Sequence, residues 1–191
     1  MRILCFGDSN TYGFDPRGFF GGRYEDNGRW PEVLGTLSGH EVINEGQNAR
    51  RVPHLQRDVE MFRNTLENTK PDLLIIMLGT NELLTGFEPE DARRRMEGLL
   101  NHVPEGIRVM LIGPPAISRG EWVSDEKIIQ GIPKISELYR ELARERGTLF
   151  LAAGSLPLSH DRVHLSEEGN RQLAKLVWDF IREIPDLEEM R

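Results

Sequence analysis

Three residues that lie far apart in the chain have the types needed for nucleophilic catalysis. Ser9 follows the apolar run Ile3–Phe6, and Asp161 and His164 lie three residues apart near the other end. A serine hydroxyl is a weak nucleophile until a base removes its proton, and that base is usually a histidine oriented by a carboxylate. We expect Asp161 to reach the near ring nitrogen of His164, which leaves the far nitrogen to face Ser9. The chemistry of such a set is acyl transfer.

Acyl transfer also needs N–H donors for the negatively charged oxygen of its tetrahedral intermediate. Three groups of the right type follow apolar runs: the backbone amides of Ser9 and Gly46, and the side-chain amide of Asn81. Each residue also has a purely structural interpretation, since a serine can cap a helix and glycine or asparagine can form a turn. No His or Cys cluster has the spacing of metal ligands, so we expect no metal.

These candidate residues need a scaffold that brings them together. Amphipathic helical patterns, the clearest of them over Leu173–Ile181, alternate with five short apolar runs: Ile3–Phe6, Glu41–Asn44, Leu73–Leu78, Arg108–Ile112 and Thr148–Ala152. The alternation predicts one α/β domain over residues 1–191, a flavodoxin-like three-layer α/β/α fold with a five-stranded parallel sheet in the order 2-1-3-4-5. Ligands bind beyond the carboxyl ends of such strands, where the candidate residues would meet.

Composition narrows the class of partner. The net charge of −7, with charges of both signs mixed along the chain, argues against binding to nucleic acid or to an anionic membrane. No apolar run approaches the length of a membrane helix or of a signal-peptide core, and the single cysteine allows no internal disulfide. We therefore expect a cytoplasmic protein whose partner is a small molecule. Cys5, inside the first apolar run, is expected to pack in the core.

Four sequence blocks together resemble the SGNH hydrolases, also called the GDSL esterase/lipase family. They are, in family order, Gly7-Asp8-Ser9, Gly46, Gly79-Thr80-Asn81-Glu82 and Asp161-Arg162-Val163-His164. The longer stretches RILCFGDSNTYGF, NEGQNAR and LLIIMLGTNE look like the arylesterase/acyltransferase branch. The resemblance implies Ser9 as nucleophile, His164 as base and Asp161 as its orienting carboxylate. It also implies an oxyanion hole from Ser9, Gly46 and Asn81, and no metal or organic cofactor.

Several residues keep open roles beside these blocks. Asn10 stands where the family usually has Leu, and Glu82 where it usually has Asp. Arg29 and Arg50 either bind substrate or tie loops together, and His160 is a less suitable base that does not match the motif. The loops Tyr12–Arg29 and Pro114–Pro133 are expected to wall the site. The candidate substrate contacts are Asn10, Tyr12, Phe14 and Trp122.

The expected function is hydrolysis of carboxylic esters with a small acyl group through an acyl-serine, with acyl transfer to an alcohol as a second outcome. A carbohydrate O-deacetylase or a thioesterase would use the same residues, and a catalytically silent small-molecule binding module is the non-enzymatic alternative. Because an imidazole must be neutral to accept a proton, the rate should fall below a pH of about 6.5. A homo-oligomer is expected to close the pocket, and light scattering that reports a monomer would contradict it.

Overall fold

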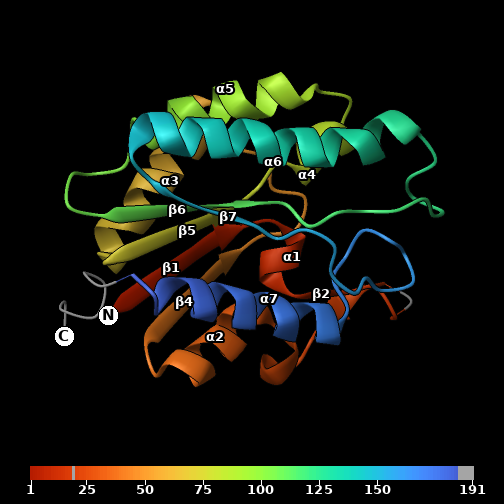
Figure 1. Cartoon of the computed structure of the whole chain (residues 1–191), viewed down its shortest axis with the longest axis horizontal. Coiled ribbons are helices and arrows are strands. Elements are labelled where there is room, and N and C mark those ends of the chain that lie inside the picture. The colour runs from red at the N-terminus through yellow and green to blue at the C-terminus, as the bar shows by residue number, and fades with distance from the viewer. Residues whose placement is uncertain (19, 185–191) are drawn as a thin grey trace.

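A five-stranded parallel sheet forms the centre of the computed structural model, which describes residues 1–18 and 20–184 (Figure 1). Its strands are β1 (Arg2–Gly7), β4 (Glu41–Gly46), β5 (Leu73–Met77), β6 (Arg108–Gly113) and β7 (Leu149–Ala152). They lie in the order β4-β1-β5-β6-β7, and each neighbouring pair is parallel. This is the 2-1-3-4-5 order predicted from the apolar runs, so the flavodoxin-like α/β fold is confirmed.

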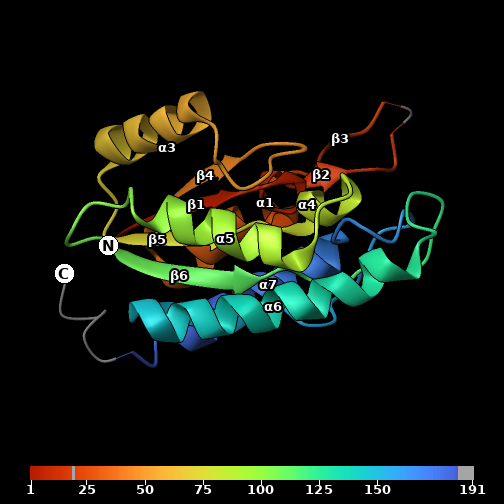
Figure 2. The same ribbon diagram turned by 90° about the horizontal axis from the view of Figure 1, so that it is seen from above.

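Helices cover both faces of the sheet and complete the three layers (Figures 1 and 2). One face carries α2 (Trp30–Ser38) and α7 (Glu167–Ile181), and the other carries α3 (Gln56–Thr69), α5 (Pro89–Leu100) and α6 (Glu126–Arg146). The short helices α1 (Ser9–Tyr12) and α4 (Thr80–Leu84) begin directly beyond the carboxyl ends of β1 and β5. Within the described residues, none of these helices is long and apolar enough to span a bilayer.

The central strands β1, β5 and β6 lack polar side chains beyond their first residue because both of their faces are covered. In β1, Leu4 and Phe6 pack in the cluster beneath α3, α5 and α6, whereas Ile3 and Cys5 pack in the cluster beneath α2 and α7. All four side chains are buried. Buried parallel strands therefore lack the alternating pattern of half-exposed strands, and the thiol of Cys5 lies in the core as expected.

Two segments that the sequence analysis treats as loops contain regular structure. Residues Tyr12–Arg29 hold a two-stranded antiparallel hairpin, β2 (Phe14–Asp15) and β3 (Gly22–Arg23), and a 3-10 turn (Asp26–Gly28). The prediction of a loop over Pro114–Pro133 is wrong for the residues after Asp125, because α6 begins at Glu126 and continues through Pro133. Asp125 caps this helix by accepting the N–H of Lys127. The capping residue is the signal that identifies the start of α6.

Candidate active site

Ser9, His164 and Asp161 form a hydrogen-bonded chain beyond the carboxyl end of the sheet. The hydroxyl oxygen of Ser9 lies 2.9 Å from Nε2 of His164, and Nδ1 of His164 lies 2.5 Å from Oδ2 of Asp161. All three residues are buried. With Nδ1 protonated and donating to Asp161, Nε2 accepts from the serine hydroxyl, which is the tautomer that a general base needs. The two ring nitrogens thus make the contacts that the three-residue spacing predicts.

A tight turn holds Asp161 against His164. Oδ1 of Asp161 accepts the backbone N–H groups of Val163 and His164, both at 3.1 Å, and Arg162 adopts a left-handed φ of 64°. Burial alone would raise the pKa of Asp161, but hydrogen bonds from the side chain and backbone of His164 and from Val163 outweigh it and hold this pKa below its ordinary value. Asp161 is therefore ionised near neutral pH and can stabilise a positive charge on the ring of His164.

Ser9 begins helix α1, and Asp8 positions it there. Oδ1 of Asp8 accepts the N–H of Asn10 at 2.9 Å, and its backbone carbonyl accepts those of Thr11 and Tyr12. No described residue accepts the N–H of Ser9. That donor is therefore free to face an oxyanion beside the serine hydroxyl.

Asp8 is a buried carboxylate, and its burial raises its pKa from 3.8 to about 6 against the hydrogen bond from Asn10. Because the folded protein then binds the Asp8 proton more tightly than the unfolded chain, stability falls as the pH rises from about 4 to about 6 and stays low above. A shift of two pKa units corresponds to about 3 kcal/mol.

The variant Asp8→Asn keeps an acceptor for the Asn10 N–H and removes this charge. It should therefore be more stable than the wild type by up to about 3 kcal/mol above pH 6, with a smaller gain at pH 4.5. Urea unfolding at pH 4.5 and 7.5 measures both differences. An equal difference at the two pH values would show that the charge of Asp8 is not the cause.

Asn81 and Glu82, at the start of α4, form hydrogen bonds to the backbone of the loop that follows β4. Nδ2 of Asn81 donates to the carbonyl of Arg50 at 3.0 Å, and Oε1 of the fully buried Glu82 accepts the N–H of Val52 at 2.8 Å. Glu82 also pairs with Arg95 at 3.3 Å. The amide of Asn81 has a second N–H, and Asn81 lines the cavity that contains Ser9. Glu82, whose role the sequence left open, therefore holds this loop.

The structure does not bring Gly46 to that cavity. The N–H of Gly46 donates to Oδ1 of Asn44 at 2.9 Å, and the residue is not part of the cavity lining. A Cβ atom at Gly46 would lie 2.0 Å from the backbone nitrogen of Tyr12. The glycine therefore allows the end of β4 to approach α1 closely, which is a structural role.

Ala49, which the sequence analysis does not single out, lines the cavity together with Ser9 and Asn81. Its φ of 60° lies in the left-handed region, and no described residue accepts its N–H. A backbone donor has no side-chain signature, so the only sequence signal is the place of Ala49 in the stretch NEGQNAR. Its amide is a third candidate oxyanion donor, in the place expected for that of Gly46.

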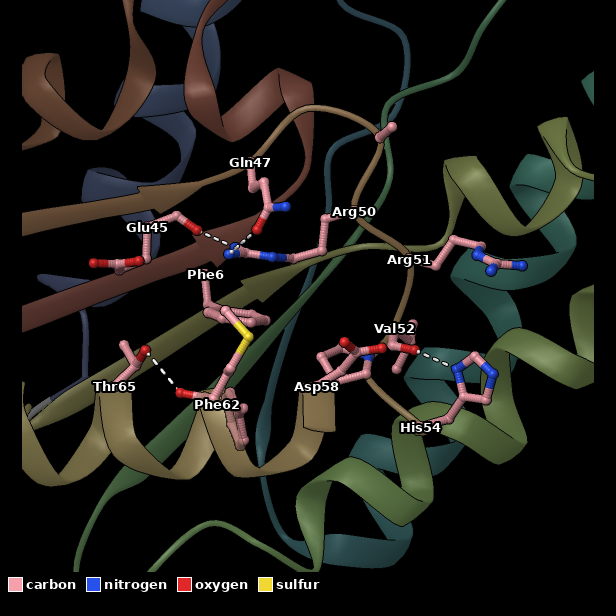
Figure 3. Close-up of a pocket in the computed structure, with 13 residues that line it drawn as sticks. Phe6, Glu45, Gln47, Arg50, Arg51, Val52, His54, Asp58, Phe62 and Thr65 are labelled. Carbon is pink, nitrogen blue, oxygen red and sulfur yellow. Dashed lines mark hydrogen bonds between the residues drawn. The ribbon is translucent and has the colours of Figure 1, made fainter. Parts of the chain in front are cut away.

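Arg50 connects the loop that follows β4 to the end of β1. Figure 3 shows its guanidinium beside Glu45 and Gln47, where it donates to the carbonyl of Glu45 and, at 3.0 Å, to Oε1 of Gln47. A further hydrogen bond of 3.0 Å reaches the carbonyl of Gly7, two residues before Ser9. Arg50 lines a separate cavity of about 380 Å³, which shares only Ala49 with the catalytic one. Its role is to hold loops together.

Two other residues left open by the sequence lie outside the catalytic cavity. Arg29 is buried at the start of α2 and forms ion pairs with Asp26 and Glu32, so it connects the 3-10 turn before α2 to the first turn of that helix. His160 is exposed. Among the described residues, no group of three or more His, Cys, Asp or Glu side chains could hold a metal ion.

The catalytic cavity is small, about 180 Å³, and its walls are largely apolar. The ring of Phe14 lies 4.6 Å from the ring of His164, and the ring of Trp122 lies 6.1 Å from it. Ala49, Leu84 and Val163 also belong to the apolar lining. A cavity of this size fits a short acyl chain.

Of the four predicted substrate contacts, Asn10, Phe14 and Trp122 line the cavity, and Tyr12 does not. The Tyr12 ring instead packs beneath the guanidinium of Arg23, 4.5 Å from the ring centroid. Phe19, which belongs to the expected loop wall, lies outside the described residues.

The fold and this arrangement define a class: serine hydrolases built on a flavodoxin-like sheet. Residues 5–172 match the GDSL-like Lipase/Acylhydrolase family, and the chain belongs to this family. The predicted SGNH resemblance is thereby confirmed, and the chain is a carboxylic ester hydrolase.

Solved structures show the same relationship. The aryl esterase of M. smegmatis has a TM-score of 0.85 at 27% sequence identity, with 96% of this chain and 99% of that chain covered. A carbohydrate acetylesterase family member from Sinorhizobium meliloti has a TM-score of 0.82 at 26% identity, with 95% and 97% covered. Comparison with curated protein sequences gave no significant match.

Proposed function

We propose that this chain hydrolyses carboxylic esters of small acyl groups through an acyl-serine intermediate at Ser9. The observation that carries the proposal is the chain of hydrogen bonds from Ser9 through His164 to Asp161, which opens into a cavity of about 180 Å³. The protein would act as a single catalytic domain without a metal or organic cofactor.

In the first half of the reaction, the Ser9 oxygen attacks the ester carbonyl while Nε2 of His164 takes its proton. The negative oxygen of the tetrahedral intermediate would accept hydrogen bonds from the backbone amides of Ser9 and Ala49 and from Nδ2 of Asn81. Collapse of the intermediate breaks the bond to the alcohol, which receives the proton from His164. Asp161 stabilises the imidazolium between these two steps.

In the second half, His164 takes a proton from water, and the hydroxide formed attacks the acyl-serine. The carboxylic acid leaves, and the proton returns from Nε2 to the oxygen of Ser9. An alcohol in place of water would give a new ester by the same steps. The apolar side chains of Phe14 and Trp122 beside His164 favour this transfer, because they limit the water near the acyl-enzyme.

The proposal predicts a strong preference for short acyl chains. Among p-nitrophenyl esters from acetyl to decanoyl, kcat/KM should peak between acetyl and butyryl and be at least about 10-fold lower for decanoyl, because long chains do not fit the cavity. Initial rates across the series measure this, with Ser9→Ala as the background. A maximum at decanoyl would contradict the small-acyl assignment, and a wild type as inert as Ser9→Ala would favour a binding module.

A carbohydrate O-deacetylase is the second candidate, and the likeness to the S. meliloti carbohydrate acetylesterase supports it. Acetyl is the smallest acyl group of the series, so a sugar acetate agrees with the same cavity. A panel of acetylated sugars and acyl thioesters separates this candidate and a thioesterase from a simple esterase.

A cytoplasmic location and a homo-oligomer remain part of the proposal. Trp122 supports the oligomer, because 60% of this large apolar side chain is exposed at the cavity rim, where a second copy would cover it.

A further inference from the structure

We propose that Asn10 is a positioning residue that holds the catalytic base, His164, against the nucleophile. The inference rests on the ester hydrolysis proposed above and assigns a role to the residue that departs from the usual family leucine. Asn10 follows Ser9 directly, and only 4% of it is exposed. Its side chain therefore cannot act as an ordinary solvated amide.

The side chain of Asn10 crosses from the nucleophile segment to the base segment. Its Oδ1 accepts the backbone N–H of Leu165, the residue after His164, at 2.8 Å. The two segments are 155 residues apart in the sequence and are thus joined at two adjacent points, by the Ser9–His164 and Asn10–Leu165 hydrogen bonds. The Asn10–Leu165 hydrogen bond fixes the distance between the two segments that the Ser9–His164 hydrogen bond requires.

The other backbone contacts of His164 cannot set this separation. Its N–H donates to Asp161 and its carbonyl accepts the N–H of Ser159. Both partners belong to the turn that carries His164, so these bonds shape the turn without fixing its distance from α1. The Asn10 side chain supplies that link, and a leucine there would leave the buried N–H of Leu165 without this acceptor.

Positioning and substrate contact make different kinetic predictions for Asn10, which also lines the cavity. A positioning residue acts on the proton transfer and lowers kcat by one factor for every acyl chain that fits. A residue that binds substrate raises KM, by an amount that depends on the acyl chain.

The test compares Asn10→Leu, which removes the acceptor, with Asn10→Asp, which keeps an oxygen in its place. Asn10→Leu should lower kcat by about 10- to 100-fold with little change in KM, and by the same factor for acetyl, propionyl and butyryl esters. Asn10→Asp should have a kcat close to that of the wild type when each is measured at the plateau of its own pH–rate profile. A change confined to KM, or a factor that varies with the acyl chain, would overturn the proposal.

Asn170 offers a matched control. It is also buried, and its Oδ1 accepts the N–H of Trp30 at 3.2 Å across 140 residues, which ties α7 to α2. Its Nδ2 donates to the carbonyl of Ser166 at 3.0 Å and contacts that of Leu165 at 3.5 Å. Within the described residues its side chain thus bonds to the start of α7 and to α2, but not to the Ser9–Asn10 segment. Asn170→Leu should therefore lower the unfolding temperature as Asn10→Leu does, while kcat stays at the wild-type value. An equal loss of kcat in both variants would mean that Asn10 is merely structural.

A second readout does not depend on turnover. The ring ¹⁵N NMR signals of His164, assigned with His164→Gln, report whether Nε2 accepts a hydrogen bond. They should change in Asn10→Leu and stay near the wild-type positions in Asn10→Asp and Asn170→Leu. If wild type and variants are all inert toward esters yet the signals change as expected, the proposed substrate class fails and the positioning role stands. If the wild type is active and neither rate nor signals change, the positioning role fails alone.

Discussion

Replacing Ser9 with alanine is expected to lower kcat/KM for p-nitrophenyl acetate by about 10⁴-fold or more. The hydroxyl is the only group at this position that can form the acyl-enzyme, and it is already hydrogen-bonded to Nε2 of His164 at 2.9 Å. Because Ser9 is buried and small, the loss of one oxygen should leave the fold intact, which circular dichroism and thermal unfolding check. Initial rates with purified protein measure the loss.

Ser118→Ala is the matched control for this prediction. Ser118 lies in the loop after β6, and its backbone N–H donates to the carbonyl of Arg162 at 3.1 Å. The substitution removes a hydroxyl from the same end of the sheet and keeps that backbone contact. Activity should be unchanged, and a fluorophosphonate should label the wild type and Ser118→Ala once but not Ser9→Ala. Continued turnover or labelling of Ser9→Ala would mean that another residue is the nucleophile.

The sheet could be predicted from the sequence because the apolar character of a buried strand is visible in a short run of consecutive residues. Strands that are covered on both faces must be apolar at their buried positions, which makes the central strands visible in the sequence. The observed bounds of the five strands differ from the predicted ones by at most two residues. The hairpin of Phe14–Asp15 and Gly22–Arg23 has strands of two residues each, which is too short for any periodicity to appear.

Side-chain members of the site were predictable for a related reason. Ser9, Asn81 and Asp161 each have a functional group that the sequence displays, and parallel strands bring their ends to one edge of the sheet. A backbone N–H donor cannot be recognised in this way, because nearly every residue type carries one. Whether Gly46 or Ala49 presents its N–H to the cavity depends on the left-handed φ of Ala49 and on the acceptor that Asn44 supplies to Gly46. Neither follows from residue type.

The same limit explains Asn10 and Tyr12. Their positions close to Ser9 made both candidates for substrate contact, but the distant partner of each side chain decides its role. Asn10 bonds to Leu165, 155 residues away, and Tyr12 packs against Arg23. Such partners are set by tertiary structure, which single-sequence patterns do not contain.

Asp161→Asn should lower kcat by about 10⁴-fold while the active site keeps its shape. Asparagine can still accept the N–H groups of Val163 and His164 through Oδ1, as Asp161 does at 3.1 Å. Its Nδ2 would then donate to Nδ1 of His164, so the ring proton moves to Nε2. In that tautomer the nitrogen that faces Ser9 can no longer accept the serine proton.

Stability provides an independent check on this variant. The pKa of Asp161 lies below its ordinary value in the folded protein, so its carboxylate stabilises the fold above the unfolded-state pKa of about 4. That contribution disappears as the pH falls through the folded-state pKa. Asp161→Asn should therefore be less stable than the wild type at pH 7, with a difference that shrinks on acidification.

Asp125→Asn is the control for Asp161→Asn, because Asp125 accepts the Lys127 N–H at 2.9 Å as a helix cap and asparagine caps equally well. It should keep full activity. A loss of less than about 10-fold in Asp161→Asn, with Asp125→Asn unchanged, would show that the tautomer of His164 is fixed by something other than Asp161. A full loss of kcat, together with the pH-dependent loss of stability, would assign both the orientation and the ionisation of the pair to this one carboxylate.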